Sequence, residues 1–477
     1  MLHLLLKYFL DRFKKGFRIF LIEGGKIMMK IKLLGIFVCM LLIVTTIPAV
    51  TCVDNDDLYT TPSSSNQDGS FVICNDIQTQ SINSKIQEII EKINETLIKN
   101  FMAYLVLEIG SRYTGTDGCK KAANYIYQQF ENMGLQSKYQ DWSSRGNNLF
   151  AGIFTSQNVI GTHQGTDQNS DEIIIFNAHY DTPKELVGAV DDGSGTVGVL
   201  AAAYVLSQYN FKRTMEFVAF SGEENGLLGS HAYAREIYDQ QTPVLVEFNA
   251  DMIGKATSKE TGKTIRLSVT EDAGWIADIM EKMTKDYGFY FNIARWQKID
   301  RDAKSGYSDY FEFTQLGYES IVVWPGEWDP NMHTPQDNIS NVNFSYLVNT
   351  TRHIAATIAI LADTDIEQPQ LHITNPRFGK ILFNDNEKKT YKYKTPIILD
   401  ETNIYAEVKQ GIYPIEKVEF YYDDKLLLTD TEKPYEYMLN KTSIGFHKIK
   451  VIAYDTIGTD ATDEMKILFI NIPKNQL

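Results

Sequence analysis

The sequence is poor in cysteine, with four residues in a chain of 477. So few cysteines exclude the dense disulfide framework of a small secreted scaffold, and the length allows one large or two to three ordinary domains. Basic residues are also in the minority, 46 against 61 acidic ones, which leaves a net charge of -15. We therefore expect neither nucleic acid nor an anionic membrane surface among the partners.

Near the N-terminus, the apolar run 33–47 is shorter than the roughly 20 residues of a transmembrane helix. A basic stretch, 28–32, precedes it and small residues follow it, which is the pattern of a secretory signal peptide. We expect translation to start at Met28 or Met29 and residues 1–52 to be an N-terminal extension plus signal peptide. The mature protein is then secreted or extracytoplasmic, without a stable transmembrane anchor; an uncleaved N-terminal anchor is the alternative.

The segment that follows looks like scaffold rather than site. Residues 53–75 are predicted to be a flexible leader, because small polar residues dominate their first part. Apolar residues recur at helical spacing from Ser81 to Leu107 and again over Cys119 to Asn132, which predicts two helices. Cys74 and Cys119 both persist after processing, so an exported protein can pair them.

The most informative stretch runs from Ile173 to Gly195. An apolar run predicts a buried strand, and His179 and Asp181 stand at its end. A glycine-bounded turn containing Asp191 then leads into a small-residue helix, predicted to begin near Thr196. Open α/β sheets build their sites in this way, with polar residues at the carboxyl ends of strands.

The same pattern recurs three times further along the chain. Apolar strands are predicted at 215–220, 244–248 and 320–324, with helical segments between them. This alternation indicates an α/β fold with a mostly parallel mixed sheet flanked by helices. The residues that follow these strands are Glu223-Glu224, Asp251 and His333, so we expect them at one edge of the sheet with His179.

Imidazoles and carboxylates at one edge fit a hydrolytic site with two zinc ions. Such a site needs several carboxylates, one of which bridges the two ions. Asp191 is the natural bridge, because it lies in a tight turn between the others. Glu223 is the candidate general base, since neighbours on an extended segment point apart. Asp181 is a candidate to accept the second ring N–H of a ligand histidine. The candidate ligands are His179, Asp191, Glu224, Asp251 and His333.

The arrangement of these motifs resembles the M28 family of zinc aminopeptidases over roughly residues 76–364. The resemblance implies a zinc-peptidase fold (phosphorylase/hydrolase-like) over 76–366. It also implies that His179 and Asp251 hold one metal, that Glu224 and His333 hold the other, that Asp191 bridges them, and that the Asp191–Asp192 peptide is cis. The matching pieces, in the family's order, are HYD (179–181), GAVDDGSG (188–195), SGEENGLLGS (221–230), NADMIG (249–254) and NMHTPQDN (331–338), preceded by a similar pre-site segment at 112–118.

Two departures from the family pattern concern the substrate side. Tyr310 follows Ser308-Asp309 where the family usually has histidine, which puts substrate contacts rather than metal binding in doubt. Some members place an oxyanion-stabilising tyrosine at the position of Ser305. We name Tyr307 as the candidate donor; an ordinary surface tyrosine is the alternative.

Residues 371–475 have a different character, with alternating segments and little helical periodicity. Several short strands over about 100 residues predict an all-β sandwich. The segment resembles immunoglobulin-like modules of exported bacterial and archaeal enzymes. Such a module either contacts the cell surface or substrate, or acts as a spacer.

These observations together predict an exported metallo-aminopeptidase. It would use two Zn²⁺ per chain to hydrolyse N-terminal residues from peptides with a free N-terminus. A zinc carboxypeptidase and a glutaminyl-cyclase-like enzyme on the same fold are alternatives, although cyclase relatives bind one zinc. A non-catalytic binding protein is a third alternative. The presence of the full set of candidate ligands and of Glu223 argues against it.

Overall fold

The computed structural model describes residues 83–146, 152–167, 170–300, 303, 305–366, 368–390 and 394–472. The predicted signal peptide, the leader and Cys74 lie outside these residues, so the export signal and the pairing of Cys74 with Cys119 stay predictions. None of the helices described in these ranges combines the length and the apolar character needed to cross a membrane.

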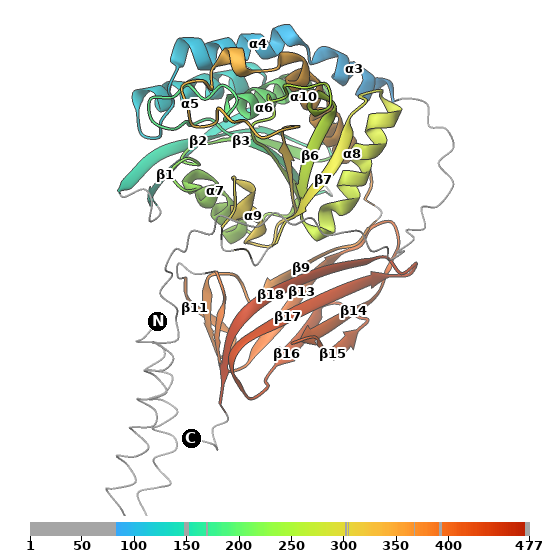
Figure 1. Cartoon of the computed structure of the whole chain (residues 1–477). Coiled ribbons are helices and arrows are strands. Elements are labelled where there is room, and N and C mark those ends of the chain that lie inside the picture. Colours follow the sequence, from blue (N-terminus) through green and yellow to red (C-terminus); the bar gives the residue numbers. More distant parts are fainter. Residues whose placement is uncertain are drawn as a thin grey trace, which may run out of the picture. The chain divides into compact units, whose positions relative to one another are not determined.

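The N-terminal part of the described chain contains an eight-stranded sheet with the order β1-β2-β4-β3-β5-β8-β6-β7 (Figure 1). Its centre is parallel, since β3 pairs with β4 and β5, and β5 pairs with β8; β6 and β7 form a fourth parallel pair. The pairs β1/β2, β2/β4 and β6/β8 are antiparallel, which confirms a mixed, mostly parallel sheet. The strands are β1 Gln136–Arg145, β2 Ile153–His163, β3 Ile173–His179, β4 Thr214–Phe220, β5 Val244–Ala250, β6 Thr264–Val269, β7 Asn292–Lys298 and β8 Ser320–Trp324.

Helices cover both faces of this sheet (Figure 1). Along β3, Ile174 and Phe176 belong to the core beneath α6 and α10, while Ile173 and Ile175 belong to the core beneath α7. This alternation follows from the two-residue period of a strand. The helices are α3 Ser84–Lys92, α4 Glu95–Ala103, α5 Asp117–Asn132, α6 Gly193–Leu206, α7 Leu228–Asp239, α8 Gly274–Asp286, α9 Tyr310–Thr314 and α10 Phe344–Asp363.

Two sequence-based helix predictions need correction. The helical pattern from Ser81 to Leu107 is not one helix, because the Asn94 side chain accepts a hydrogen bond from the Leu97 N–H and starts α4. A short π-helix, Tyr104–Ile109, then follows. The helix predicted to begin near Thr196 begins three residues earlier, since Asp192 caps it at the Gly195 N–H.

The C-terminal part of the described chain is a β-rich region with its own hydrophobic core, which includes Val418, Phe420 and Val451. It contains a seven-stranded sheet, β11-β10-β12-β18-β17-β14-β15, and a three-stranded sheet, β16-β13-β9. Its identification as an immunoglobulin-like module stays a prediction. The strands are β9 Gln370–Asn375, β10 Lys380–Phe383, β11 Asn386–Thr390, β12 Ile397–Leu399, β13 Thr402–Lys409, β14 Ile415–Tyr422, β15 Lys425–Asp430, β16 Tyr435–Leu439, β17 Ser443–Asp455 and β18 Asp460–Asn471.

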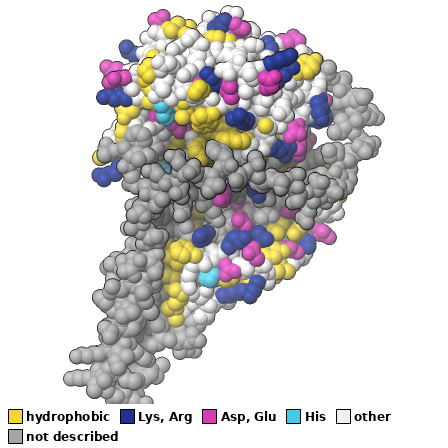
Figure 2. All heavy atoms as spheres, viewed as in Figure 1, with side chains coloured by type: hydrophobic (Ala, Val, Ile, Leu, Met, Phe, Trp, Pro, Cys, Tyr) yellow, Lys and Arg dark blue, Asp and Glu magenta, His cyan; other side chains and the backbone are white. Residues whose placement is uncertain are grey.

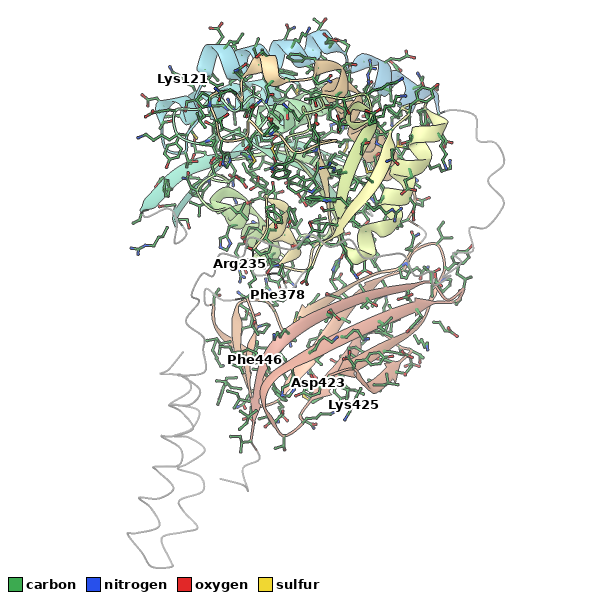
Figure 3. The ribbon with its side chains drawn as sticks, in the orientation of Figure 1. Lys121, Arg235, Phe378, Asp423, Lys425 and Phe446 are labelled. Carbon is green, nitrogen blue, oxygen red and sulfur yellow. The ribbon has the colours of Figure 1, made fainter. Side chains whose placement is uncertain are left out.

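Two segments of this region contain turn-forming residues, with different outcomes. Asp423 and Asp424 form the turn between β14 and β15, with φ of 47° and 60° (Figure 3 labels Asp423 and Lys425). The residues from Ile444 to Phe446 lie within β17, although Gly445 is among them. On the face drawn in Figure 2, the acidic and basic side chains of the described residues are interspersed.

Candidate metal centre

The centre of the sheet brings three polar segments to one edge. His179 is the last residue of β3, Asp251 follows β5 directly, and the Glu223-Glu224 pair lies in the turn after β4. Because β4, β3 and β5 are adjacent and parallel, their carboxyl ends lie side by side. Side chains that are far apart in the sequence therefore meet at the usual position of a site in an open α/β sheet.

Asp191 lies between the two histidines of this edge. Its Oδ1 is 3.3 Å from His179 Nε2, and its Oδ2 is 3.1 Å from His333 Nε2. Glu224 Oε2 is 3.2 Å from the same nitrogen of His333. Two ligands of one tetrahedral zinc lie about 3.3 Å apart, given metal–ligand bonds of about 2.0–2.2 Å. These spacings therefore fit ligands of two neighbouring metal ions that share Asp191.

All six candidate ligand and base residues lie in one cluster. Within each of three groups, the candidate ligand atoms lie within 4.8 Å of one another. Tyr307 lies on the segment before α9, and 69% of its surface is exposed. The groups are His179, Glu223 and Glu224; His179, Asp191 and Asp251; and Asp191, Glu224 and His333.

The two neighbouring glutamates reach the cluster by a different route from the one expected. The segment after β4 is a turn, in which the Gly226 N–H donates to the Glu223 carbonyl, and not an extended chain. Both carboxylates therefore enter the cluster, but they face different histidines. Glu223 Oε2 lies 3.9 Å from His179 Nε2, whereas Glu224 faces His333.

The Asp181 carboxylate contacts the main chain of the site more closely than it contacts the ring of His179. The His179 Nδ1 lies 3.3 Å from the Asp181 carbonyl oxygen and 3.7 Å from the carboxylate oxygen Oδ1. The same carboxylate accepts hydrogen bonds from the Glu223 N–H and from the Thr114 hydroxyl, at 3.2 and 2.8 Å. Asp181 thus supports the ring through its carbonyl and fixes the start of the turn that carries Glu223.

The cluster concentrates acidic groups away from water. Burial and the nearby Asp191 raise the pKa of Glu224 to about 7, and burial is the main reason that the pKa of Asp251 rises to about 6. Burial also raises the pKa of Glu223 well above its ordinary value, although His179 opposes the shift. For Asp191, the hydrogen bonds with the two histidines overcome burial and lower the pKa.

The donor set fits a divalent cation. Glu224 Oε1 and Asp251 Oδ1 are buried, and neither makes a hydrogen bond within the described ranges of the chain. A bound cation stabilises carboxylates that otherwise repel one another in a buried site. Mixed imidazole and carboxylate donors are the set that zinc prefers in hydrolytic centres.

The peptide bond between Asp191 and Asp192 is cis, as the resemblance implied. The two residues then diverge in role. Asp191 faces the histidines, whereas Asp192 Oδ1 accepts hydrogen bonds from the N–H groups of Gly195 and Met252, at 2.8 and 3.0 Å. Asp192 therefore joins the start of α6 to the segment after β5.

Sequence reasoning missed two residues that support this site. Arg112 is fully buried and donates to the carbonyl groups of Tyr180, Val187 and Gly188, at 2.6, 2.7 and 2.9 Å. Asp337, also buried, accepts hydrogen bonds from the backbone N–H groups of Val190 and Asp191. Arg112 lies in the segment 112–118 and Asp337 in the segment 331–338. Both segments resemble the family's motifs, and this resemblance was the signal that could have identified the two residues.

The Ser308-Asp309-Tyr310 segment packs under the site. Burial raises the pKa of Asp309 to about 7. Tyr310, the residue that replaces the usual histidine, is buried and makes an edge-to-face contact with Trp324 at 6.4 Å between ring centroids. Its ring therefore serves packing beside the site.

Comparison with known proteins agrees with this geometry. Residues 158–358 match the family described as Peptidase family M28. Aminopeptidase YwaD of Bacillus subtilis (strain 168) is 31% identical over 199 residues, which are 40% of this chain and 41% of that protein. Leucine aminopeptidase 2 of Trichophyton rubrum is 29% identical over 251 residues, 47% of this chain and 48% of that protein.

The chain therefore spans less than half the length of these curated relatives. A solved structure of a zinc aminopeptidase from Bacillus subtilis shares the fold, with a TM-score of 0.50 and 19% identity. That match covers 57% of this chain and 96% of the solved chain. The sequence match, the sheet and the ligand cluster agree with one another: residues 158–358 are similar to peptidase family M28 in sequence, and the chain shares the fold of a solved zinc aminopeptidase.

Proposed function

We propose that this protein is an exported metallo-aminopeptidase that removes N-terminal residues from peptides with two zinc ions per chain. The observation that carries the proposal is the position of Asp191, whose two carboxylate oxygens face two different histidines. A carboxylate shared between two ligand sets is what a two-metal hydrolase requires. The names of the two relatives, both aminopeptidases, support the substrate class.

The three ligand groups support an assignment of the two metal positions. His179 and Asp251 would hold one zinc, Glu224 and His333 the other, and Asp191 would bridge them. Zinc, when bound there, polarises the scissile carbonyl and lowers the pKa of an attacking water toward about 7.

Glu223 is the group we propose to move the proton. Its carboxylate lies beside His179 at the edge of the ligand cluster, and its side chain is 13% exposed, so a water molecule can reach it. It would take the proton of the attacking water and deliver it to the leaving amine, a transfer worth roughly 10²–10⁴ in rate. Asp181 keeps Glu223 in place through the main-chain N–H.

The exposed Tyr307 is proposed as a donor to the developing oxyanion. Its side chain is on the surface, three residues before the start of α9, and no hydrogen bond in the described structure restrains its hydroxyl. A mobile tyrosine at this position would have to turn toward the metal centre when substrate binds. Tyr307→Phe should therefore lower kcat and leave KM nearly unchanged.

A panel of aminoacyl-anilides, each with a free and with an acetylated α-amine, tests the proposed activity. An aminopeptidase hydrolyses the free-amine members only. Hydrolysis of acetylated anilides would favour an endopeptidase, hydrolysis of N-acetyl dipeptides with a free carboxyl end would favour a carboxypeptidase, and cyclisation of N-terminal glutamine would favour a glutaminyl cyclase. A zinc-loaded protein inactive on every member would favour a binding protein.

We also propose that the protein is exported and that its β-rich region is an immunoglobulin-like module that acts as a spacer or contacts the cell surface. The signal-peptide pattern before Cys52 supports export. Two sheets around a separate core support a self-contained module. N-terminal sequencing of protein from the culture medium tests export, since cleavage near residue 52 is expected and a mature chain that retains 33–47 would contradict it.

A further inference from the structure

His333 is held less directly than the other candidate ligands. It lies on the loop between β8 and α10, its side chain is 51% exposed, and its backbone is in the left-handed region at φ 58°. A left-handed conformation is uncommon for a residue with a side chain and persists where surrounding contacts impose it. Contacts elsewhere in the loop must therefore determine where the His333 ring lies.

Asp337, four residues later, provides such a contact. Its Oδ1 accepts from the Val190 N–H at 2.7 Å, and its Oδ2 accepts from the Asp191 N–H at 3.0 Å. Its carbonyl oxygen accepts from the Ala189 N–H at 3.4 Å. Asp337 is 2% exposed, so water cannot replace these bonds. Asp337, a residue of the His333 loop, thus accepts hydrogen bonds from three consecutive backbone N–H groups, of which the last belongs to Asp191.

The beginning of the same loop is fixed by a buried ion pair. Lys255 Nζ lies 3.0 Å from Asp329 Oδ1, and the two residues are 4% and 1% exposed. The same carboxylate also accepts from the N–H of Asn331 and the side chain of Asn341. Because Lys255 follows Asp251 by four residues, the loop is tied to the strand end that carries another candidate ligand.

We propose that Asp337 is a positioning residue that sets His333 against Asp191 and thereby completes the metal position of Asp191, Glu224 and His333. The inference rests on the two-zinc centre proposed above. Asp337 touches no ligand atom; it acts through the backbone of the bridging residue and through the loop. The Lys255–Asp329 pair assists by holding the other end of that loop. Supporting residues of this kind typically change metal affinity about 10- to 100-fold.

Asp337→Asn tests the proposal, because the amide keeps the shape but can accept only one of the two side-chain hydrogen bonds. Zinc affinities are measured by competition with chelators of graded strength, which does not depend on activity. We expect one of the two zinc ions to bind about 10- to 100-fold more weakly and the other to change by less than about threefold. Asp329→Asn should weaken the same zinc ion.

His333→Ala identifies the affected position, since it should remove the weakened zinc ion. In a His333→Ala background, Asp337→Asn should leave the affinity of the remaining zinc unchanged. Asp455→Asn is the matched control. Asp455 is also a buried aspartate that accepts two backbone N–H groups, from Ile457 and Thr459, but on the single oxygen Oδ1 and in the β17–β18 turn. Asp455→Asn should alter neither zinc affinity.

The outcomes separate this inference from the proposed function. Wild-type protein that binds fewer than two zinc ions would refute the two-zinc centre itself. Two zinc ions in the wild type, with both affinities unchanged or equally reduced in Asp337→Asn, would overturn the positioning role alone. If Asp337→Asn does not fold, Asp329→Asn decides: selective loss of the His333-linked zinc supports the proposal, and unchanged affinities refute it.

Discussion

Glu223 and Glu224 are neighbours in the chain, yet one faces His179 and the other faces His333. Their contacts predict opposite effects of the same substitution. Glu223→Gln should keep both zinc ions and lower kcat by about 10²–10⁴, because it removes a proton carrier and no ligand. Glu224→Gln should lower the zinc content. Metal analysis alongside kcat checks both, and a Glu223→Gln enzyme with more than a tenth of the wild-type kcat would refute the assignment.

His353 is a buried histidine that the mechanism does not use. It packs against Phe289 and Phe291, and burial lowers its pKa to about 4. Its folded-state pKa lies below the unfolded value, so the unfolded state takes up a proton first as the pH falls, and stability decreases. Between about pH 7 and pH 5 this should cost about 2 kcal/mol.

Urea unfolding at the two pH values, compared between wild type and His353→Gln, measures this effect. Other groups also titrate in this range, so the relevant quantity is the difference between the two proteins. The wild type should lose about 2 kcal/mol more than the variant. Equal losses would show that His353 is protonated in the folded protein.

The sequence predicted which side chains gather at the site but not what holds them. The gathering of His179 and Asp251 follows from strand ends alone, since parallel neighbours end at one edge. Arg112 and Asp337 act through hydrogen bonds to backbone groups of distant loops, and such bonds leave no periodic pattern in the sequence. The carbonyl contact of Asp181 was hidden for a similar reason, because spacing does not distinguish a carbonyl from a carboxylate.

At the scale of elements, the start of α6 depends on the absence of a side chain. A Cβ on Gly195 would lie 2.3 Å from the Ala250 carbonyl oxygen and 2.3 Å from Asp192 Oδ2. Gly195→Ala should therefore lower the free energy of unfolding by at least about 1–3 kcal/mol. At Gly274, the first residue of α8, a Cβ would meet nothing within 4 Å.

Gly274→Ala is thus the matched control and should change stability by less than about 1 kcal/mol, in the stabilising direction. Chemical denaturation of both variants measures the contrast. If the two variants are equally stable, α6 can move away from the strand ends at no cost in free energy. That result would contradict the tight packing that we infer around Asp191 and Asp192.

Strands of the central sheet were predictable, whereas its edge strands were not. β3, β5 and β8 are buried throughout and appear in the sequence as apolar runs. β1 and β7 lie at the two edges, contain many exposed positions and carry polar residues, so hydrophobicity gives no signal for them. The break between α3 and α4 arises because Asn94 caps the start of α4. The apolar residues keep helical spacing on both sides of Asn94, so their pattern does not reveal the break.

For the whole molecule, metal binding should contribute to stability. The side chains of Asp191, Glu224 and Asp251 are largely buried together, and a bound cation offsets their repulsion and their loss of hydration. Removal of metal with a chelator should therefore lower the Tm, and added zinc should restore it. Asp191→Ala protein should show little response to either treatment. If neither the chelator nor added zinc changes the wild-type Tm, zinc does not bind at this cluster.

The most direct test of the two-zinc centre is a crystal structure of the zinc-loaded protein with anomalous data collected at the zinc absorption edge. We expect two anomalous peaks in each chain. One should lie between His179 and Asp251 and the other between Glu224 and His333, with one Asp191 oxygen on each. A single peak, or peaks that Asp191 does not join, would contradict a bridged two-zinc centre.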